Sequence, residues 1–525
     1  MTCEPKLEPS ILEKHLAQLL QRECSNKQIP GLYAVLLDQE GIVWQGSGGS
    51  ADLAGVRRFT EDTLFRIGSI TKLVTGFLVM QQVESGRIAL DDPIGKHLPE
   101  FQPHSDFDNP ITIRRLLQHK SGLVREAPGG CYFLSSNASL EEIVSSLNQT
   151  RLLWEPGTKT SYSNAGVCVL GLMLERLESK PYEQLVQERI FKPLGMQDSR
   201  LELNEDVRAA LAEAQMCPYH QKTQPAPVNK PNSVPAGGIF SSPRDLTRLA
   251  STLLRGGEPV LSASLLQSMW QLEQEDDTIA LGFFVRELFG HKAVGHGGTI
   301  YGYATELELL PSENLGVLVF VTQDIGNNIA RRLSAHILEL ALKLRRGQSL
   351  PGFIQTQDAD LQCYSRLVGT YRNGDSLAWI RVNNGKLSAE INGTIGELRR
   401  HKEHWAMDCA QVFVDDIQLN ESGLIVGDQN YLRDEHVDSA GLPEETLIGN
   451  YGSEASCPMQ IYARSGRLWA RVANCFYQPL VEEEAGIFRF PEDSLFFAAE
   501  AVRFETGDDG VVAALIIGEI KLPRL

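Results

Sequence analysis

The chain has 525 residues, 42% of them hydrophobic, so it is long enough for two or three packed domains and too apolar to be disordered. Its 67 acidic side chains outnumber the 49 basic ones and give a net charge of −18. Such a surface repels phosphate backbones and anionic lipids unless basic residues gather in one patch, and the arginines form only isolated doublets. These features argue against nucleic acid or a membrane surface as a partner.

The nine cysteines are scattered, odd in number and never spaced as CxxC, which favours neither a disulfide framework nor a zinc ribbon. His401 and His404 lie close together but without further ligands, so we expect no metal site, and no motif calls for a cofactor. The first twenty residues are charged and lack the apolar core of a signal peptide, and no later stretch is long and apolar enough to span a bilayer. We therefore expect a cytoplasmic protein, provided that no signal peptide has been removed.

The first 345 residues are predicted to form one α/β unit. Apolar residues recur at helical spacing over 8–22, two β-rich runs at 32–37 and 42–45 form a hairpin, and a helix-rich middle follows. Late in the unit, 303–310 and 315–321 form a second strand pair, and helical spacing returns over 329–344. This order predicts an α/β sandwich, an antiparallel sheet built from both ends of the domain and flanked by helices, with a helical subdomain between.

Beyond a turn-rich linker at 346–360, the sequence changes to short β-like runs. Leu367-Val-Gly-Thr-Tyr371 is echoed 80 residues later by Leu447-Ile-Gly-Asn-Tyr451, and a turn and strand that follow each match as well. The repeat predicts two antiparallel all-β, barrel-like domains, 361–440 and 441–525. One larger barrel with two similar hairpins is the alternative.

Ser69 and Lys72 form an SxxK motif just before the apolar helical run 73–83, which places Ser69 in the first turn of a buried helix. Residues i and i+3 share a helix face, so the Lys72 amine lies within reach of the Ser69 hydroxyl. Burial favours the neutral amine, which can accept the serine proton, and the helix N-terminus stabilises negative charge on the nucleophile. SxxK alone arises by chance in many long chains.

Tyr162 and Asn164 form a Tyr-x-Asn after a turn, and alternate residues of an extended segment share a face, so both can point into one cleft. Tyr162 can relay a proton to a leaving group, while the Asn164 amide can hold the substrate or Lys72. By itself the motif is equally typical of a structural tyrosine in a loop.

The segment Gly295-His296-Gly297-Gly298-Thr299 precedes the late strand pair. Glycines on an edge strand let a substrate backbone approach and pair with it. The backbone amides of Ser69 and Thr299 are candidates for an oxyanion hole, with His296 as the polar group at the reacting centre.

These three motifs, in this order, resemble the SxxK, YxN and KTG or HxG motifs of the serine β-lactamase and penicillin-binding-protein superfamily, in its class C and D-aminopeptidase branch. The stretches 111–123 and 235–246 resemble phrases common in that group. True class C β-lactamases carry a lysine where this chain has His296, and its loss is expected to weaken recognition of the penicillin carboxylate. The HxG form followed by two β units is similar to the D-aminopeptidases.

The resemblance implies a serine hydrolase that acts through an acyl-enzyme on short peptides or amides. A carboxylesterase is the close alternative, a peptide cyclase or acyltransferase the third, and a catalytically silent binding scaffold the alternative of another class. The expected partner is a small peptide or ester substrate. Homo-oligomerisation is also compatible with the β units, and no residue decides between monomer and dimer.

Overall fold

The computed structural model describes residues 9–130, 137–216, 224–229, 233–374, 376–383, 385–434, 445–453, 458–464, 467–472, 476–484, 486–494, 496–507 and 509–525. The chain forms two compact units. The first comprises Met1–Met216, Pro225–Pro351 and Gly518–Ile520, and the second comprises Cys217–Gln224, Gly352–Ile517 and Lys521–Leu525. Within the described parts of the chain, no helix combines the length and apolarity that crossing a membrane requires.

The first unit is built around a six-stranded antiparallel sheet. Its spatial order is β2 (Gly41–Gly49), β1 (Gly31–Asp38), β10 (Leu315–Val321), β9 (Tyr303–Leu310), β8 (His291–Ile300) and β7 (Phe284–Leu288). Strands from the start and the end of the unit therefore lie side by side, as β1 and β10 do from the pair Leu32 and Val321 onward. This confirms the predicted sheet and both predicted strand pairs.

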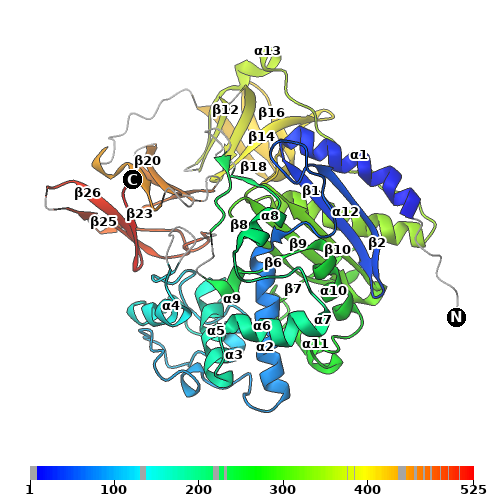
Figure 1. Cartoon of the computed structure of the whole chain (residues 1–525). Helices are drawn as coiled ribbons and strands as arrows, with labels where there is room; N and C mark the ends of the chain where they lie inside the picture. Colours follow the sequence, from blue (N-terminus) through cyan, green and yellow to red (C-terminus); the bar gives the residue numbers. More distant parts are fainter. Residues whose placement is uncertain are drawn as a thin grey trace. The chain divides into compact units, whose positions relative to one another are not determined.

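Helices cover both faces of this sheet (Figure 1). The helices of the unit are α1 (Pro9–Lys27), α2 (Thr71–Glu84), α3 (Ile113–Leu117), α4 (Leu140–Ser146), α5 (Asn164–Glu178), α6 (Tyr182–Val186), α7 (Lys192–Leu194), α8 (Glu205–Ala210), α9 (Val234–Gly237), α10 (Pro243–Leu254), α11 (Ala263–Met269) and α12 (Asn327–Arg345). The terminal helices α1 and α12 pack on the sheet, and α12 lies along β10 and β9. The apolar helices α2 and α5 pack together within the large hydrophobic core and form the predicted helical subdomain.

The second unit contains a closed up-and-down barrel. Its strands are β11 (Gly369–Asn373), β12 (Ser376–Asn383), β13 (Lys386–Ile391), β14 (Thr394–His401), β15 (His404–Asp408), β16 (Phe413–Leu419), β17 (Gly423–Val426) and β18 (Gln429–Asp434). Each strand pairs with the next, and β18 returns to pair with β11, which closes the ring. Alternate residues such as Tyr371, Ile380, Ile417 and Tyr431 fill the interior. The predicted all-β C-terminal region is confirmed.

The remaining strands extend this unit. They are β19 (Gly449–Tyr451), β20 (Met459–Arg464), β21 (Arg467–Val472), β22 (Phe476–Pro479), β23 (Val481–Glu484), β24 (Ile487–Arg489), β25 (Ala501–Thr506), β26 (Val512–Ile517) and β27 (Ile520–Pro523). Strand β22 joins the barrel sheet at β14, while β23 to β27 form a sheet of their own. The division of this region into two domains stays a prediction.

The sequence repeat has a physical basis in the second unit. In its first copy the buried Tyr371 hydroxyl donates to the carbonyl of Leu367 at 2.7 Å. In its second copy the buried Tyr451 hydroxyl donates to the carbonyl of Leu447 at 2.8 Å. Each tyrosine thus pins the 3₁₀ turn that precedes its strand, which explains the spacing of leucine, glycine and tyrosine in both copies.

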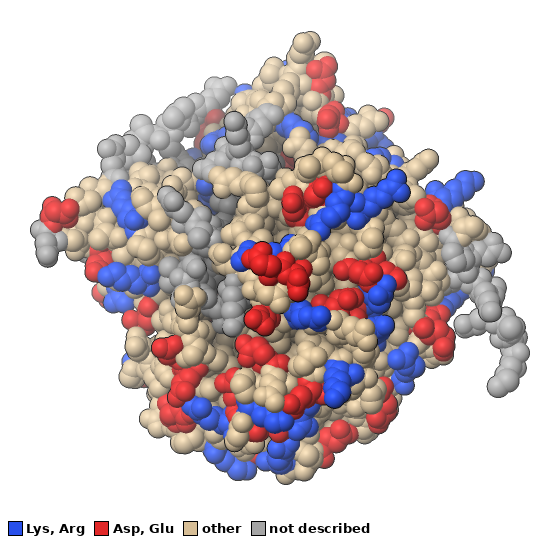
Figure 2. Space-filling view, in the orientation of Figure 1, with Lys and Arg blue, Asp and Glu red and all other residues tan. Residues whose placement is uncertain are grey.

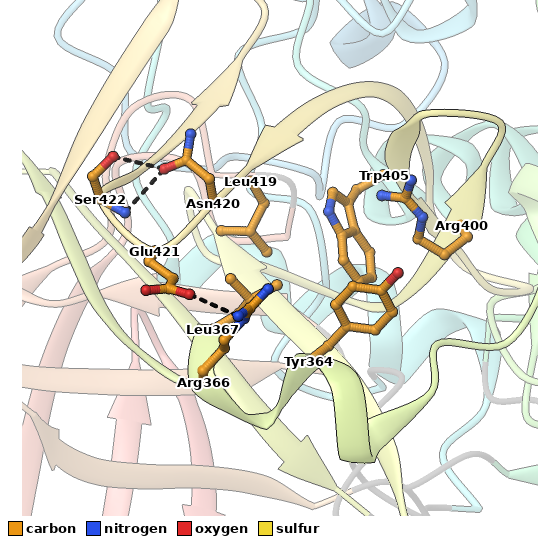
Figure 3. A pocket seen from close by; sticks show the side chains of 9 residues that line it. All are labelled: Tyr364, Arg366, Leu367, Arg400, Trp405, Leu419, Asn420, Glu421 and Ser422. Atoms are coloured by element: carbon orange, nitrogen blue, oxygen red, sulfur yellow. Dashed lines mark hydrogen bonds and ion pairs between the residues drawn. The ribbon is translucent and has the colours of Figure 1, made fainter.

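One end of the barrel holds a hollow of about 460 Å³ (Figure 3). The guanidinium carbon of Arg400 lies 4.8 Å from the ring centroid of Trp405 and 5.9 Å from that of Tyr364. Its positive charge therefore interacts with both aromatic rings that line the hollow. Arg366 and Glu421 form an exposed ion pair at the rim, 3.0 Å apart. On the face drawn in Figure 2, acidic and basic side chains are interspersed, and neither sign of charge forms a large patch of its own.

Candidate active site

Ser69 lies at the entrance to helix α2. The chain arrives from the short strand β3 (Phe65–Arg66), turns through Gly68 at a φ of +53°, and forms the 3₁₀ turn η1 (Gly68–Ile70) before α2 begins at Thr71. Ser69 therefore lies in the first turn of the helix, as expected, although this turn is a 3₁₀ turn that runs without a break into α2. Gly68 takes a left-handed conformation, which favours glycine, and this conformation turns the backbone into the helix. Ser69 lies at the positive end of the helix dipole.

Lys72 projects from α2 towards Ser69. Its Nζ lies 3.0 Å from the Ser69 Oγ and donates to the carbonyl of Ala236 at 2.7 Å. Only 3% of the Lys72 surface is exposed, whereas Ser69 is half-buried. The amine also lies 4.9 Å from the ring centroid of Tyr162. The structure thus brings the nucleophile, the amine and the phenol of the predicted site together.

The Asn164 side chain contacts Glu126 and not Lys72, while its predicted contact with substrate stays a prediction. Asn164 is the first residue of α5, and its amide Nδ2 donates to the Glu126 carboxylate at 2.6 Å. The preceding residue, Ser163, is the N-cap, since its hydroxyl accepts from the amide of Gly166 at 2.9 Å. The Asn164 side chain is therefore held by a buried carboxylate next to the cleft rather than by Lys72.

Strand β8 carries the glycine-rich motif. Pairing with β7 stops at Phe284, which lies opposite Gly295, so no described strand pairs with residues 296–300 on that side. On the other side, Ile300 and Tyr303 flank the two-residue turn to β9. Hydrogen-bonded and non-hydrogen-bonded pairs alternate from there, so the Thr299 amide points towards the open edge.

Two glycines, Gly298 in β8 and Gly68 next to Ser69, allow β8 and the segment that carries Ser69 to lie in close contact. A Cβ on Gly298 would lie 2.0 Å from the carbonyl oxygen of Ile67, and a Cβ on Gly68 would lie 2.6 Å from the amide nitrogen of Thr299. The backbone that carries Ser69 therefore lies directly against β8. This contact places the amides of Ser69 and Thr299 in one region, as an oxyanion hole requires.

His296 is buried beside Tyr162. Its exposed fraction is 2%, its ring centroid lies 6.3 Å from that of Tyr162, and its ring meets Phe284 edge-on at 5.0 Å. Its Nδ1–H donates to the carbonyl of Gly297 at 2.5 Å. Burial, reinforced by the charge of Lys72, lowers the pKa of His296 to about 3. The ring is therefore neutral at physiological pH.

A neutral buried His296 makes stability depend on pH. Because its folded-state pKa of about 3 lies below the ordinary value of 6.5, the unfolded chain binds the proton first as the pH falls. Between pH 6.5 and 4, this one residue is expected to remove about 1 kcal/mol of unfolding free energy per pH unit. Urea unfolding of His296→Gln should show a correspondingly weaker pH dependence than wild type. An unchanged pH dependence would contradict the assignment, and the exposed His404→Gln is the matched control.

Sequence reasoning missed the segment 119–126, which wraps around the Tyr162 turn. His119, at a φ of +55°, accepts the Ser161 amide on its carbonyl at 2.7 Å and the Ser163 amide on its Nδ1 at 3.1 Å. Its ring stacks on Tyr162 with 4.2 Å between centroids. Burial, together with the charge of Lys72, lowers the pKa of His119 well below its ordinary value. The ring therefore stays neutral and keeps Nδ1 as an acceptor.

Further along the same segment, Arg125 and Val124 complete this support. The Arg125 carbonyl accepts the amides of Asn164 at 2.8 Å and Ala165 at 3.1 Å, and the Val124 carbonyl accepts the Ser163 hydroxyl at 2.7 Å. The sequence signal was present, since 111–123 resembles a phrase of the superfamily, but nothing local shows what that phrase contacts.

Among the residues that the structure describes, no three histidine, cysteine or acidic side chains are grouped so as to hold a metal ion. The arrangement groups a serine hydroxyl at the start of a helix with a neighbouring amine and phenol, next to an open strand edge. Such a grouping is typical of hydrolases with an SxxK motif.

The chain belongs to the Beta-lactamase family, whose sequence model matches residues 12–342. It is 29% identical over 354 residues to Unguisins hydrolase ungD' of Aspergillus campestris, covering 63% of this chain and 66% of the relative. It is 27% identical over 317 residues to the D-alanyl-D-alanine-carboxypeptidase/endopeptidase AmpH of Escherichia coli, covering 56% and 79%. It is 32% identical over 235 residues to Esterase EstB of Burkholderia gladioli, covering 42% and 58%.

A solved structure extends the likeness of fold to the second unit. The octameric penicillin-binding protein homologue from Pyrococcus abyssi aligns with a TM-score of 0.58 at 19% identity. The alignment covers 81% of this chain and 100% of that one. The fold of a β-lactamase-like unit followed by an all-β region is therefore shared.

Proposed function

We propose that this protein is a serine hydrolase that forms an acyl-enzyme on Ser69 and acts on short peptides or amides. The observation that carries the proposal is the contact of 3.0 Å between the Ser69 Oγ and the Lys72 Nζ, with Tyr162 beside both. Peptidases and esterases occur among the relatives, which supports the reaction class.

In the proposed acylation, Lys72 with Tyr162 takes the proton from the Ser69 hydroxyl, and Oγ attacks the substrate carbonyl carbon. The carbonyl oxygen becomes an oxyanion held by the amides of Ser69 and Thr299. As the tetrahedral intermediate collapses, the bond to the leaving group breaks and Tyr162 returns the proton to the departing nitrogen or oxygen. The ester on Ser69 remains.

In deacylation a water molecule takes the place of the leaving group. Tyr162 accepts its proton while the oxygen attacks the ester carbonyl, and Ser69 regains its proton when the acid product leaves. His296 stays neutral beside Tyr162, so its role is to shape and desolvate this side of the cleft and to assist by hydrogen bonding rather than by charge.

The open edge of β8 supports a peptide-like substrate. An extended backbone can pair with the outward-facing backbone groups of Gly297 and Thr299, which places its carbonyl near the two oxyanion amides. An ester lacks one backbone donor but presents the same carbonyl, so a carboxylesterase is the second candidate, and Esterase EstB supports it. The octameric relative makes self-association a further expectation.

Chromogenic substrates test the proposal. We expect Ser69-dependent hydrolysis of p-nitroanilides of D- or L-amino acids, measured beside p-nitrophenyl esters, with Ser69→Ala as the control. Cleavage of the esters alone would replace the peptidase by the esterase. Activity that survives in Ser69→Ala would overturn the proposed mechanism.

A further inference from the structure

Arg125 lies beside the ring of Tyr162 but has no role in the proposed mechanism. Four charged or titratable side chains of the described chain face the ring of Tyr162, namely Lys72 from α2, His119 and Arg125 from the segment 119–126, and His296 from β8. Both histidines are buried and neutral. Of these four side chains, Arg125 is the one whose positive charge is permanent, because a guanidinium does not lose its proton in proteins.

Arg125 is held in place by its backbone and its neighbour. Its guanidinium carbon lies 5.1 Å from the ring centroid of Tyr162, about as near as the Lys72 amine at 4.9 Å. Its carbonyl caps the start of α5 through the amides of Asn164 and Ala165, so the residue moves with the Tyr162 turn. Only 19% of the Arg125 side chain is exposed, so the guanidinium is largely shielded from water.

We propose that Arg125 is the second cation of the catalytic centre and stabilises the negatively charged form of Tyr162, through which the proton passes during acylation. This inference rests on the proposed function and deepens it. A positive charge about 5 Å from the ring favours the phenolate, and the half-buried setting reduces the screening by water. Arg125 acts through Tyr162 and is therefore a positioning and electrostatic residue, not a group that touches the reacting atoms.

Glu126 places a negative charge next to Arg125. Its Oε1 lies 3.6 Å from the Arg125 Nε and accepts the Asn164 amide at 2.6 Å. This carboxylate offsets part of the arginine charge, and its removal should strengthen the effect of Arg125 on Tyr162. The two neighbours are thus expected to act on the same step in opposite directions.

The pH profile of kcat/KM with p-nitrophenyl acetate, an uncharged ester, tests the inference. The acid limb reports the loss of the base form of the Lys72 and Tyr162 pair. Arg125→Gln removes the cation, so we expect the midpoint of this limb to move to higher pH by about one unit. Arg125→Lys keeps a cation and should restore most of the wild-type midpoint. Glu126→Gln, which can still accept from Asn164, should move the midpoint to lower pH.

The exposed Arg176→Gln is the control for loss of a positive charge and should leave the midpoint unchanged. A merely structural role of Arg125 would lower kcat/KM at every pH without moving the limb, and that result would overturn the inference. If Arg125→Gln does not fold, Glu126→Gln decides, because an unchanged or higher midpoint contradicts the proposal. Activity that persists in Ser69→Ala would instead refute the proposed function itself, so the two failures are distinguishable.

Discussion

Replacing Lys72 by methionine is expected to lower kcat/KM by about 10³-fold or more at neutral pH. The Lys72 amine lies 3.0 Å from the Ser69 Oγ and is nearly fully buried, so water cannot take its place as a base. Methionine has a similar length and no charge, and it leaves the Ser69 hydroxyl and the carbonyl of Ala236 without the Lys72 donor. The measurement is steady-state hydrolysis of p-nitrophenyl acetate, with thermal unfolding to show that the variant is folded.

Lys96 offers the matched control for this substitution. Its side chain is 60% exposed and pairs with Asp92 at 2.8 Å on the surface. Lys96→Met therefore removes a lysine charge without touching the cleft and should leave kcat/KM within about twofold, because an exposed ion pair contributes little. A folded Lys72→Met variant that lost less than about tenfold would show that Lys72 is not the base.

Substitutions at His119 are expected to lower kcat by about 10²-fold with little change in KM. His119 holds three consecutive residues through its carbonyl, its Nδ1 and its ring, and Tyr162 lies at their centre. A displacement of Tyr162 by about 1 Å suffices for a loss of this size. Because His119 contacts the turn and not the strand edge of β8, substrate binding should be preserved.

Two variants separate the contacts of His119. His119→Asn keeps a side-chain acceptor and tolerates the positive φ, but it loses the stacked ring. His119→Phe keeps a ring, but it leaves the buried Ser163 amide unpaired, which should lower the unfolding free energy by about 1–3 kcal/mol. A folded variant of either kind with wild-type kcat would refute the positioning role.

Much of the fold could be predicted because its signals are local. The strand pair 303–310 and 315–321 matches the observed β9 and β10. The second strand is almost continuously apolar, and the first alternates Glu306 and Glu308 with leucines. A short turn with Pro311 and Asn314 separates them, so length and turn residues define their ends. The closure of β18 onto β11 is a contact between distant residues, and no local pattern encodes it.

The grouping of Ser69, Lys72 and Tyr162 could be predicted for a similar reason, since spacing on a helix and order along the chain are visible in the sequence. The supports of the site could not. The hydrogen bond between His119 and Ser163 spans 44 residues, and that between Asn164 and Glu126 spans 38. The positive φ of Gly68, which turns the chain into the 3₁₀ turn that holds Ser69, is likewise not revealed by a helical pattern.

The geometry of this site also depends on close backbone contacts between the Ser69 segment and β8. Gly68 and Gly298 let the serine segment and β8 touch, and each lies where a Cβ would come within 2.6 Å of backbone atoms of the other segment. The amides of Ser69 and Thr299 are thus brought together by two glycines from separate parts of the chain. We infer that the accuracy of the site depends as much on these glycines as on the polar side chains.

The central claim is that Ser69 is the nucleophile, and covalent labelling tests it most directly. Folded protein is treated with a fluorophosphonate or with penicillin, digested, and the adduct is located by mass spectrometry, with Ser69→Ala as the control. The account predicts one adduct on Ser69 that is absent from the variant and forms much more slowly in Lys72→Met. Folded, hydrolytically active protein without an adduct at Ser69, or with the same adduct in Ser69→Ala, would contradict it.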